Sequence, residues 1–175
     1  MISLSKNNIA MCFIVMICML PNAVNAGSVY HAASKSVVRR IITKGVNPSK
    51  FNSQARYGRM FYIAKRPSTA LAEKGQRSQL IRMRSSRGLV NNSWDLRKPT
   101  PHRLRKYTGN TDLRGTVKRG IVGPKLGQKI GKLADRQKKA ILYRSAKNGG
   151  TNVAVSRSLM EKHPRLLSQR TIYQR

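Results

Sequence analysis

Acidic residues are scarce in this sequence. It holds 5 Asp and Glu against 36 Lys and Arg, so its formal net charge at pH 7 is +31. Because carboxylates are so few, no two of them are neighbours that could form the pair of acids that glycosidase chemistry needs. The positive charge repels itself in a compact monomer, and a polyanionic partner would relieve that repulsion. The candidate partners are nucleic acid, anionic lipid or lipopolysaccharide, and an acidic immunity protein.

Long apolar runs are also few, and the main one lies near the N-terminus. Residues 9–20 are apolar, but this run is too short to span a bilayer. It follows a polar segment that carries Lys6, and it precedes Val24 and Ala26, small residues at the two positions that a signal peptidase reads. We therefore expect residues 1–26 to be a cleavable signal peptide, and the protein to be secreted or periplasmic.

Cysteine occurs only within this N-terminal segment, at Cys12 and Cys18. Cleavage before Gly27 would leave a chain with no disulfide, no thiolate ligand and no transmembrane segment, so packing must stabilise it. With 3 His and few carboxylates, the spacing predicts no ordinary zinc site. The phosphate-binding P-loop motif and the Gly-x-Ser-x-Gly nucleophile motif are absent as well.

The remaining chain has the pattern of a single α+β domain over residues 27–156. Two main amphipathic helices are expected at 34–44 and 126–139, and a short helix at 67–73, with Ser34 and Ser68 as N-caps. Short strands are expected at 29–31, 60–64, 79–84, 140–143 and 151–155, the last two forming a hairpin. The stretch 85–124 is poorly specified, and residues 157–175 are expected to form a basic C-terminal tail.

One acid stands apart from the others. Glu73 is the single carboxylate between Gly27 and Asp95, and it follows a strand that holds Tyr62. Its isolation alone favours the simpler interpretation, in which Glu73 is a solvated helix residue that pairs with a nearby Lys or Arg. Its neighbours in the sequence favour a catalytic interpretation.

Several short blocks, taken in order, resemble the toxin domains of the RES and ADP-ribosyltransferase-like group. In the first half they are residues 29–34, 45–48, 55–64 and 69–73, and in the second half 94–96, 141–146 and 149–155. The resemblance implies a compact fold with short strands in a split or mixed sheet and two main helices. It also implies NAD as the substrate and no metal.

The resemblance assigns roles position by position. Tyr62 falls where the group places an aromatic ring against nicotinamide, Glu73 where it places the carboxylate that acts on the nicotinamide ribose, and Ser145 where RES domains keep a serine. Arg56 is a candidate phosphate contact. His31 departs from the RES pattern, which prefers arginine after the first strand, and is similar to the histidine of a His-Tyr-Glu transferase site.

We therefore expect a secreted toxin or effector enzyme that cleaves NAD, with hydrolysis, phosphorolysis and ADP-ribosyl transfer all left open. As nicotinamide leaves, positive charge develops on the ribose. One well-placed carboxylate can stabilise this charge in the transition state. A ribonuclease toxin that uses His31 and His102 is an alternative. A non-enzymatic cationic antimicrobial or envelope-binding protein is another.

Overall fold

The computed structural model describes residues 27–109, 117–118 and 121–173. The expected signal peptide, with both cysteines, lies outside the described residues. In chain order the elements are β1 (Ser28–Ala33), α2 (Lys35–Lys44), the 3₁₀ helix η1 (Pro48–Lys50), β2 (Met60–Ala64), α3 (Pro67–Lys74), β3 (Gln79–Ser85), α4 (Arg87–Asn91), β4 (Ser93–Leu96), α5 (Pro101–Thr108), β5 (Val117–Lys118), β6 (Ile121–Val122), α6 (Pro124–Arg136), β7 (Ala140–Arg144), β8 (Thr151–Ser156), α7 (Arg157–Lys162) and β9 (Leu167–Tyr173). None of the helices described is long and apolar enough to cross a membrane.

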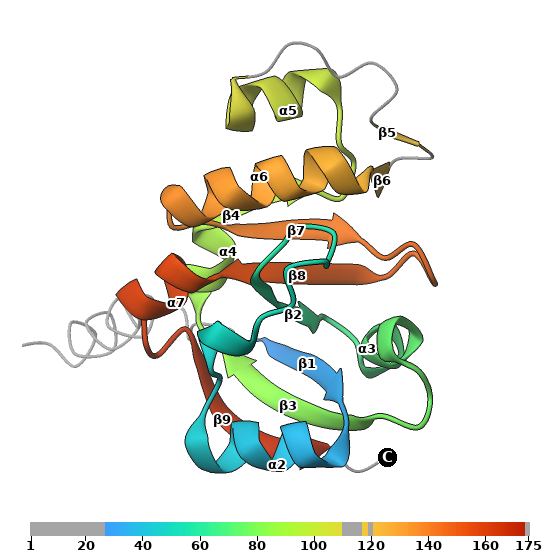
Figure 1. Ribbon diagram of the computed structural model, residues 1–175, viewed down its shortest axis with the longest axis vertical. Coiled ribbons are helices and arrows are strands. Elements are labelled where there is room, and N and C mark those ends of the chain that lie inside the picture. The colour runs from blue at the N-terminus through green and yellow to red at the C-terminus, as the bar shows by residue number, and fades with distance from the viewer. Residues whose placement is uncertain (1–26, 110–116, 119–120, 174–175) are drawn as a thin grey trace, which may run out of the picture.

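The centre of the fold is a mixed seven-stranded sheet in the order β4-β7-β8-β2-β1-β3-β9 (Figure 1). β4 and β7 run parallel, and the other neighbours in this sheet run antiparallel. The longest helices described are α2, with 10 residues, and α6, with 13. The expected α+β class, the mixed sheet and the two main helices are confirmed.

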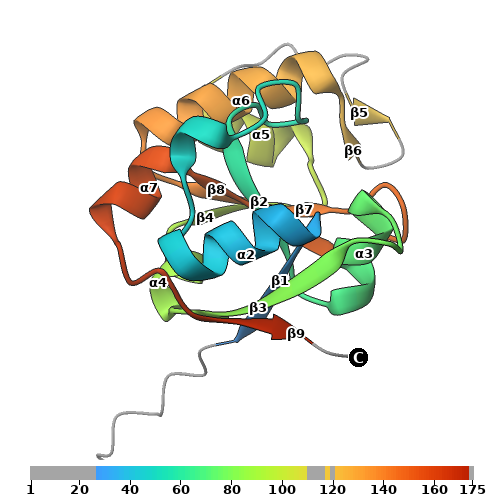
Figure 2. The same cartoon turned by 60° about the horizontal axis from the view of Figure 1, so that its bottom comes forward.

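Side chains alternate along the strands, so the sheet has a buried cluster on each face. On β2, Phe61 and Ile63 pack with α2, α4 and α7 on one face, and Met60 packs with α5 and α6 on the other. A smaller cluster lies between α3 and β1. Figure 2 shows α2 lying across β1 and β3, with α6 and α5 over the other half of the sheet.

The ends of α2 and α3 lie close to their expected positions, with one difference. Ser34 is the N-cap residue of α2, as the sequence predicts, although its side chain makes no cap hydrogen bond, and Gly45 follows the helix with φ 82°. Helix α3 ends before Gly75 as expected, but its N-cap is Arg66 instead of Ser68. The helix starts earlier because Pro67 occupies its first position, where proline already has the helical φ and needs no donor.

The poorly specified stretch 85–124 contains regular structure that only its partners reveal. Strand β4 pairs in parallel with β7, with Trp94 opposite Ile141. The Trp94 ring stacks on Tyr107 of α5 at a centroid distance of 5.3 Å. These elements are short, so their own sequence signals are weak and packing on the sheet defines them.

The expected basic tail after residue 156 is corrected by the structure. Residues 157–162 form α7, and β9 pairs antiparallel with β3 as an edge strand, with Leu80 opposite Tyr173 and Ser85 opposite Leu167. Leu159 and Leu167 are buried in the core. The folded domain therefore continues to Tyr173, and its last strand completes the sheet.

The sheet is split in its middle, between β1 and β2. These two strands, both described throughout, pair at the single position Tyr30–Ala64, whereas β2 pairs with β8 along its whole length. The strands diverge beyond Tyr30, and the backbone carbonyl of Tyr62 receives a side-chain donor instead of a strand donor. This opening is where the candidate site lies.

Candidate active site

Glu73 occupies the last turn of α3, and two neutral side chains from the β7–β8 hairpin hold its carboxylate. The Ser145 hydroxyl donates to Glu73 Oε1 at 2.6 Å, and Asn152 Nδ2 donates to the same oxygen at 2.9 Å. Ser145 is 1% exposed and Asn152 3% exposed, so both donors are fixed by the core. The carboxylate is therefore oriented by two neutral hydrogen-bond donors, and these donors do not neutralise its negative charge.

The direction of the Ser145 hydrogen bond is fixed by a backbone amide. The amide N–H of Lys147 donates to Ser145 Oγ at 3.1 Å, so the hydroxyl proton is directed to Glu73. The backbone of Ser145 also donates to the Gly150 carbonyl at 2.7 Å, which closes the hairpin turn. Ser145 is thus a positioning residue for Glu73, with its oxygen fully engaged.

Tyr62 presents its ring to the site, while its hydroxyl is occupied elsewhere. The hydroxyl donates to the Gly58 carbonyl at 3.1 Å and accepts from the Tyr57 amide at 2.9 Å. Burial raises the pKa of Tyr62 to about 12. A phenol with both hydrogen-bonding roles filled and a raised pKa is a poor proton donor or base, so the aromatic face is what Tyr62 offers.

Arg56 stands beside this aromatic wall. Its guanidinium carbon lies 5.6 Å from the centroid of the Tyr143 ring, within the range of a cation–π contact. Tyr143 in turn meets Tyr62 edge to face, at a centroid distance of 6.4 Å. Burial raises the pKa of Tyr143 above its usual range, so this phenol also stays neutral.

Two glycines of α6 place the segment that carries Arg56. A Cβ on Gly127 would lie 2.4 Å from the Arg56 carbonyl oxygen, and a Cβ on Gly131 would lie 1.9 Å from the Tyr57 carbonyl oxygen. Real Cβ atoms do not approach that closely, so only glycine lets α6 pack directly on this loop. The close packing of α6 therefore fixes the position of the Arg56 and Tyr57 backbone relative to the sheet.

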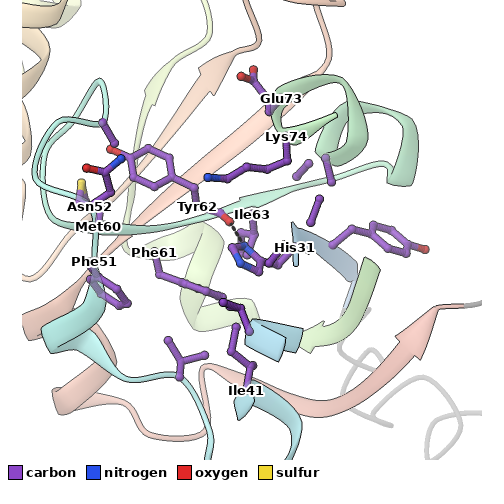
Figure 3. Close-up of a pocket in the computed structure, with 18 of the residues that line it drawn as sticks. His31, Ile41, Phe51, Asn52, Met60, Phe61, Tyr62, Ile63, Glu73 and Lys74 are labelled. Atoms are coloured by element: carbon purple, nitrogen blue, oxygen red, sulfur yellow. Dashed lines mark hydrogen bonds between the residues drawn. The ribbon is translucent and has the colours of Figure 1, made fainter. Parts of the chain in front are cut away.

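His31 bridges the opening between β1 and β2 (Figure 3). Its Nδ1 lies 2.7 Å from the carbonyl oxygen of Tyr62, which can only accept, so Nδ1 carries the proton. Burial lowers the pKa of His31, and the nearby Lys74 ammonium lowers it further, against the carbonyl hydrogen bond, which raises it. The neutral ring therefore leaves Nε2 as a hydrogen-bond acceptor.

These groups line one cavity of about 770 Å³, which is within the usual range for a small-molecule site. His31, Arg56, Tyr62 and Glu73 all line it, together with Lys74, Tyr143 and Asn152. Ser145 is not part of the lining and acts from behind Glu73. Within the described residues no cluster of three or more His, Cys, Asp or Glu side chains could hold a metal ion.

Sequence reasoning missed four contributors to this site. The sequence pattern assigns Asn152 and Tyr143 only to the hairpin, although alternation places Asn152 at a buried strand position, where an amide needs a partner. Gly127 and Gly131 are spaced four residues apart on the apolar face of α6, a pattern of close helix packing that was available in the sequence. His102 of α5 does not line the cavity, so the structure does not bring it together with His31.

Three comparisons with known proteins were made, and two of them found a match. No curated protein sequence matches the chain. A solved structure titled as the MbcT–MbcA toxin–antitoxin complex of M. tuberculosis aligns with a TM-score of 0.43 and 16% identity, over 85% of this chain and 84% of that one. The model of the RES domain family matches residues 28–173, which is the whole described fold. The chain therefore belongs to the RES domain family.

Proposed function

We propose that this protein is an exported toxin enzyme that cleaves NAD between nicotinamide and ribose. The observation that carries the proposal is the Glu73 carboxylate, held by Ser145 and Asn152 at the wall of a cavity with an aromatic side and basic groups. Membership of the RES family and the chemistry of these residues support the same reaction.

The residues fit the steps of that reaction. The C–N bond between ribose and nicotinamide breaks, and its electron pair leaves with the nicotinamide nitrogen. The positive charge that develops on the ribose is stabilised by Glu73, because a fixed carboxylate gains most when the charge has formed. Water, phosphate or a nucleophile of a macromolecule then bonds to the ribose carbon and loses its proton to solvent.

The binding groups have separate tasks. The face of Tyr62 gives the nicotinamide ring an aromatic wall, Tyr143 supports that ring edge to face, and Arg56 supplies a positive charge beside them. Ser145 and Asn152 keep Glu73 in one orientation, so little reorganisation is needed when the bond breaks.

The test is nicotinamide release from NAD by residues 27–175. Glu73→Gln keeps an oxygen that can accept from Ser145 and Asn152 but removes the charge, so release should fall about 100-fold or more. Glu161→Gln is the matched control, because Glu161 forms an exposed ion pair with Arg157. Absence of nicotinamide release by the wild-type chain, or equal rates in both variants, would overturn the proposal. Products made with and without phosphate distinguish hydrolysis from phosphorolysis, and labelled NAD in a lysate detects transfer.

Export is part of the proposal and has its own test. We expect cleavage between Ala26 and Gly27, because the small residues Val24 and Ala26 precede this bond and β1 begins just after it at Ser28. The mass of the protein recovered from the periplasm or medium checks this site. Retention of the uncleaved chain in the cytoplasm would refute export.

A partner of opposite charge is proposed on the net charge of +31. An acidic immunity protein would neutralise the toxin in the producing cell, and an anionic macromolecule such as nucleic acid or an envelope polyanion is a candidate target surface. Co-purification from the producing cell at low and high salt tests the first partner. Recovery of no acidic protein at low salt would refute it.

A further inference from the structure

Basic side chains are in excess in the cavity. Arg40, Lys50, Arg56 and Lys74 line it, and Glu73 is the one carboxylate among the lining residues. Such a cavity suits a ligand with more than one negative charge. The position of each cation then decides which part of the ligand it meets.

Lys74 follows Glu73 in the chain but does not neutralise it. The Glu73 carboxylate accepts hydrogen bonds from Ser145 and Asn152. Within the described residues the salt bridges involve the other acids Asp95 and Glu161, and none joins Glu73 to Lys74. Figure 3 shows the Lys74 side chain extending toward Tyr62, while the Glu73 carboxylate points away from it. The ammonium of Lys74 is therefore available to an anionic ligand.

His31 cannot supply that charge. Its Nδ1–H is engaged by the Tyr62 carbonyl, and burial together with Lys74 lowers its pKa, so the ring is neutral at pH 7. A neutral imidazole in this tautomer presents a lone pair at Nε2. That lone pair repels phosphate oxygens, but it can accept a hydrogen bond from a hydroxyl.

We propose that Lys74 binds the diphosphate of the dinucleotide. The inference rests on the proposed function, because it assigns parts of NAD to residues of the same cavity. In NAD the diphosphate is one ribose away from the bond that breaks, which matches a cation that lines the same cavity as Glu73 and extends away from its carboxylate (Figure 3). Lys74 is thus a binding residue that distinguishes a dinucleotide from its nucleoside fragment.

The experiment compares Lys74→Met, Lys74→Arg and Lys132→Met in residues 27–175. Lys132 is exposed on α6 and does not line the cavity, so its substitution removes the same charge elsewhere. Binding of ADP-ribose is measured by calorimetry, which needs no catalysis. Lys74→Met should weaken binding about tenfold or more, Lys74→Arg should retain most of it, and Lys132→Met should change it less than twofold. KM for nicotinamide riboside, which has no phosphate, should be the same in Lys74→Met as in the wild type.

The outcomes separate this inference from the proposed function. If NAD is cleaved but Lys74→Met binds ADP-ribose as tightly as Lys132→Met does, the assignment of Lys74 is wrong and the reaction stands. If no nicotinamide is released but ADP-ribose binding depends on Lys74, the reaction is wrong and the assignment stands. Loss of nicotinamide riboside turnover in Lys74→Met would overturn the assignment. Absence of ADP-ribose binding by the wild type would also overturn the assignment, whereas nicotinamide release still tests the reaction.

Discussion

The Ser145 hydroxyl donates a 2.6 Å hydrogen bond to Glu73 Oε1, joining residues 72 positions apart in the chain. Helix α3 supplies the acid, and the turn after β7 supplies the donor. Because the Lys147 amide fixes the direction of this hydroxyl, the pair forms a single oriented unit. Its loss should affect the rate of the reaction more than the binding of NAD.

Ser145→Ala should lower kcat for nicotinamide release about tenfold, with KM for NAD changed less than threefold. We expect about a tenfold decrease in kcat because one hydrogen bond to a charged group is lost while the hydrogen bond from Asn152 remains. Steady-state kinetics provide the measurement. Ser36→Ala on the exposed side of α2 is the control, and a variant of Ser145 with wild-type kcat would contradict a positioning role.

Gly131→Ala should destabilise the protein by about 1–3 kcal/mol, because the new methyl group would overlap the Tyr57 carbonyl. Denaturant unfolding measures the change in the free energy of unfolding. Lys132→Ala, at the next and exposed position of α6, should change it by less than about 0.5 kcal/mol. Equal stability of the two variants would show that α6 does not rest on this loop as described.

The stability of the fold should fall as pH drops below about 6.5, and His31 should be one cause. The pKa of His31 is lowered in the folded chain, so in this window the unfolded chain binds a proton that the folded chain excludes. In this pH range the free energy of unfolding therefore increases as the pH rises, and it decreases as the solution becomes more acidic. His31→Gln removes the titrating group while keeping a donor for the Tyr62 carbonyl.

Chemical denaturation between about pH 7 and pH 5 measures this slope in both proteins. Arg97 holds the pKa of Asp95 down to about 2, so this carboxylate titrates below the window and does not confuse the comparison. Identical slopes in wild type and His31→Gln would contradict a lowered pKa of His31 in the folded chain.

Deletion of residues 167–175 should abolish cooperative folding. It would remove β9, expose the edge of β3 and open the core at the buried Leu167. Circular dichroism during thermal unfolding is the measurement. Ile172→Thr is the matched control, since this side chain is 50% exposed and the strand backbone is kept. A cooperative transition in the shortened chain would restore the view of this segment as a tail.

The sequence by itself predicted the elements that have strong local signals. The alternation of β2, the amphipathic pattern of α2 and the glycine turn between β7 and β8 each depend on neighbours within a few residues. It also singled out the candidate site residues, because Glu73 is isolated among basic residues and lies in an ordered set of blocks. Four of these predicted residues, His31, Arg56, Tyr62 and Glu73, do line one cavity.

Tertiary structure decided what those residues can do. The engagement of the Tyr62 hydroxyl, the tautomer of His31 and the pairing of Glu73 with Asn152 all depend on contacts between segments distant in the chain. The same holds for β9, whose short and largely polar sequence carries only a weak strand signal until β3 provides the partner. Local sequence sets propensity and residue type, whereas hydrogen-bond direction, burial and protonation arise only when the sheet brings its strands together.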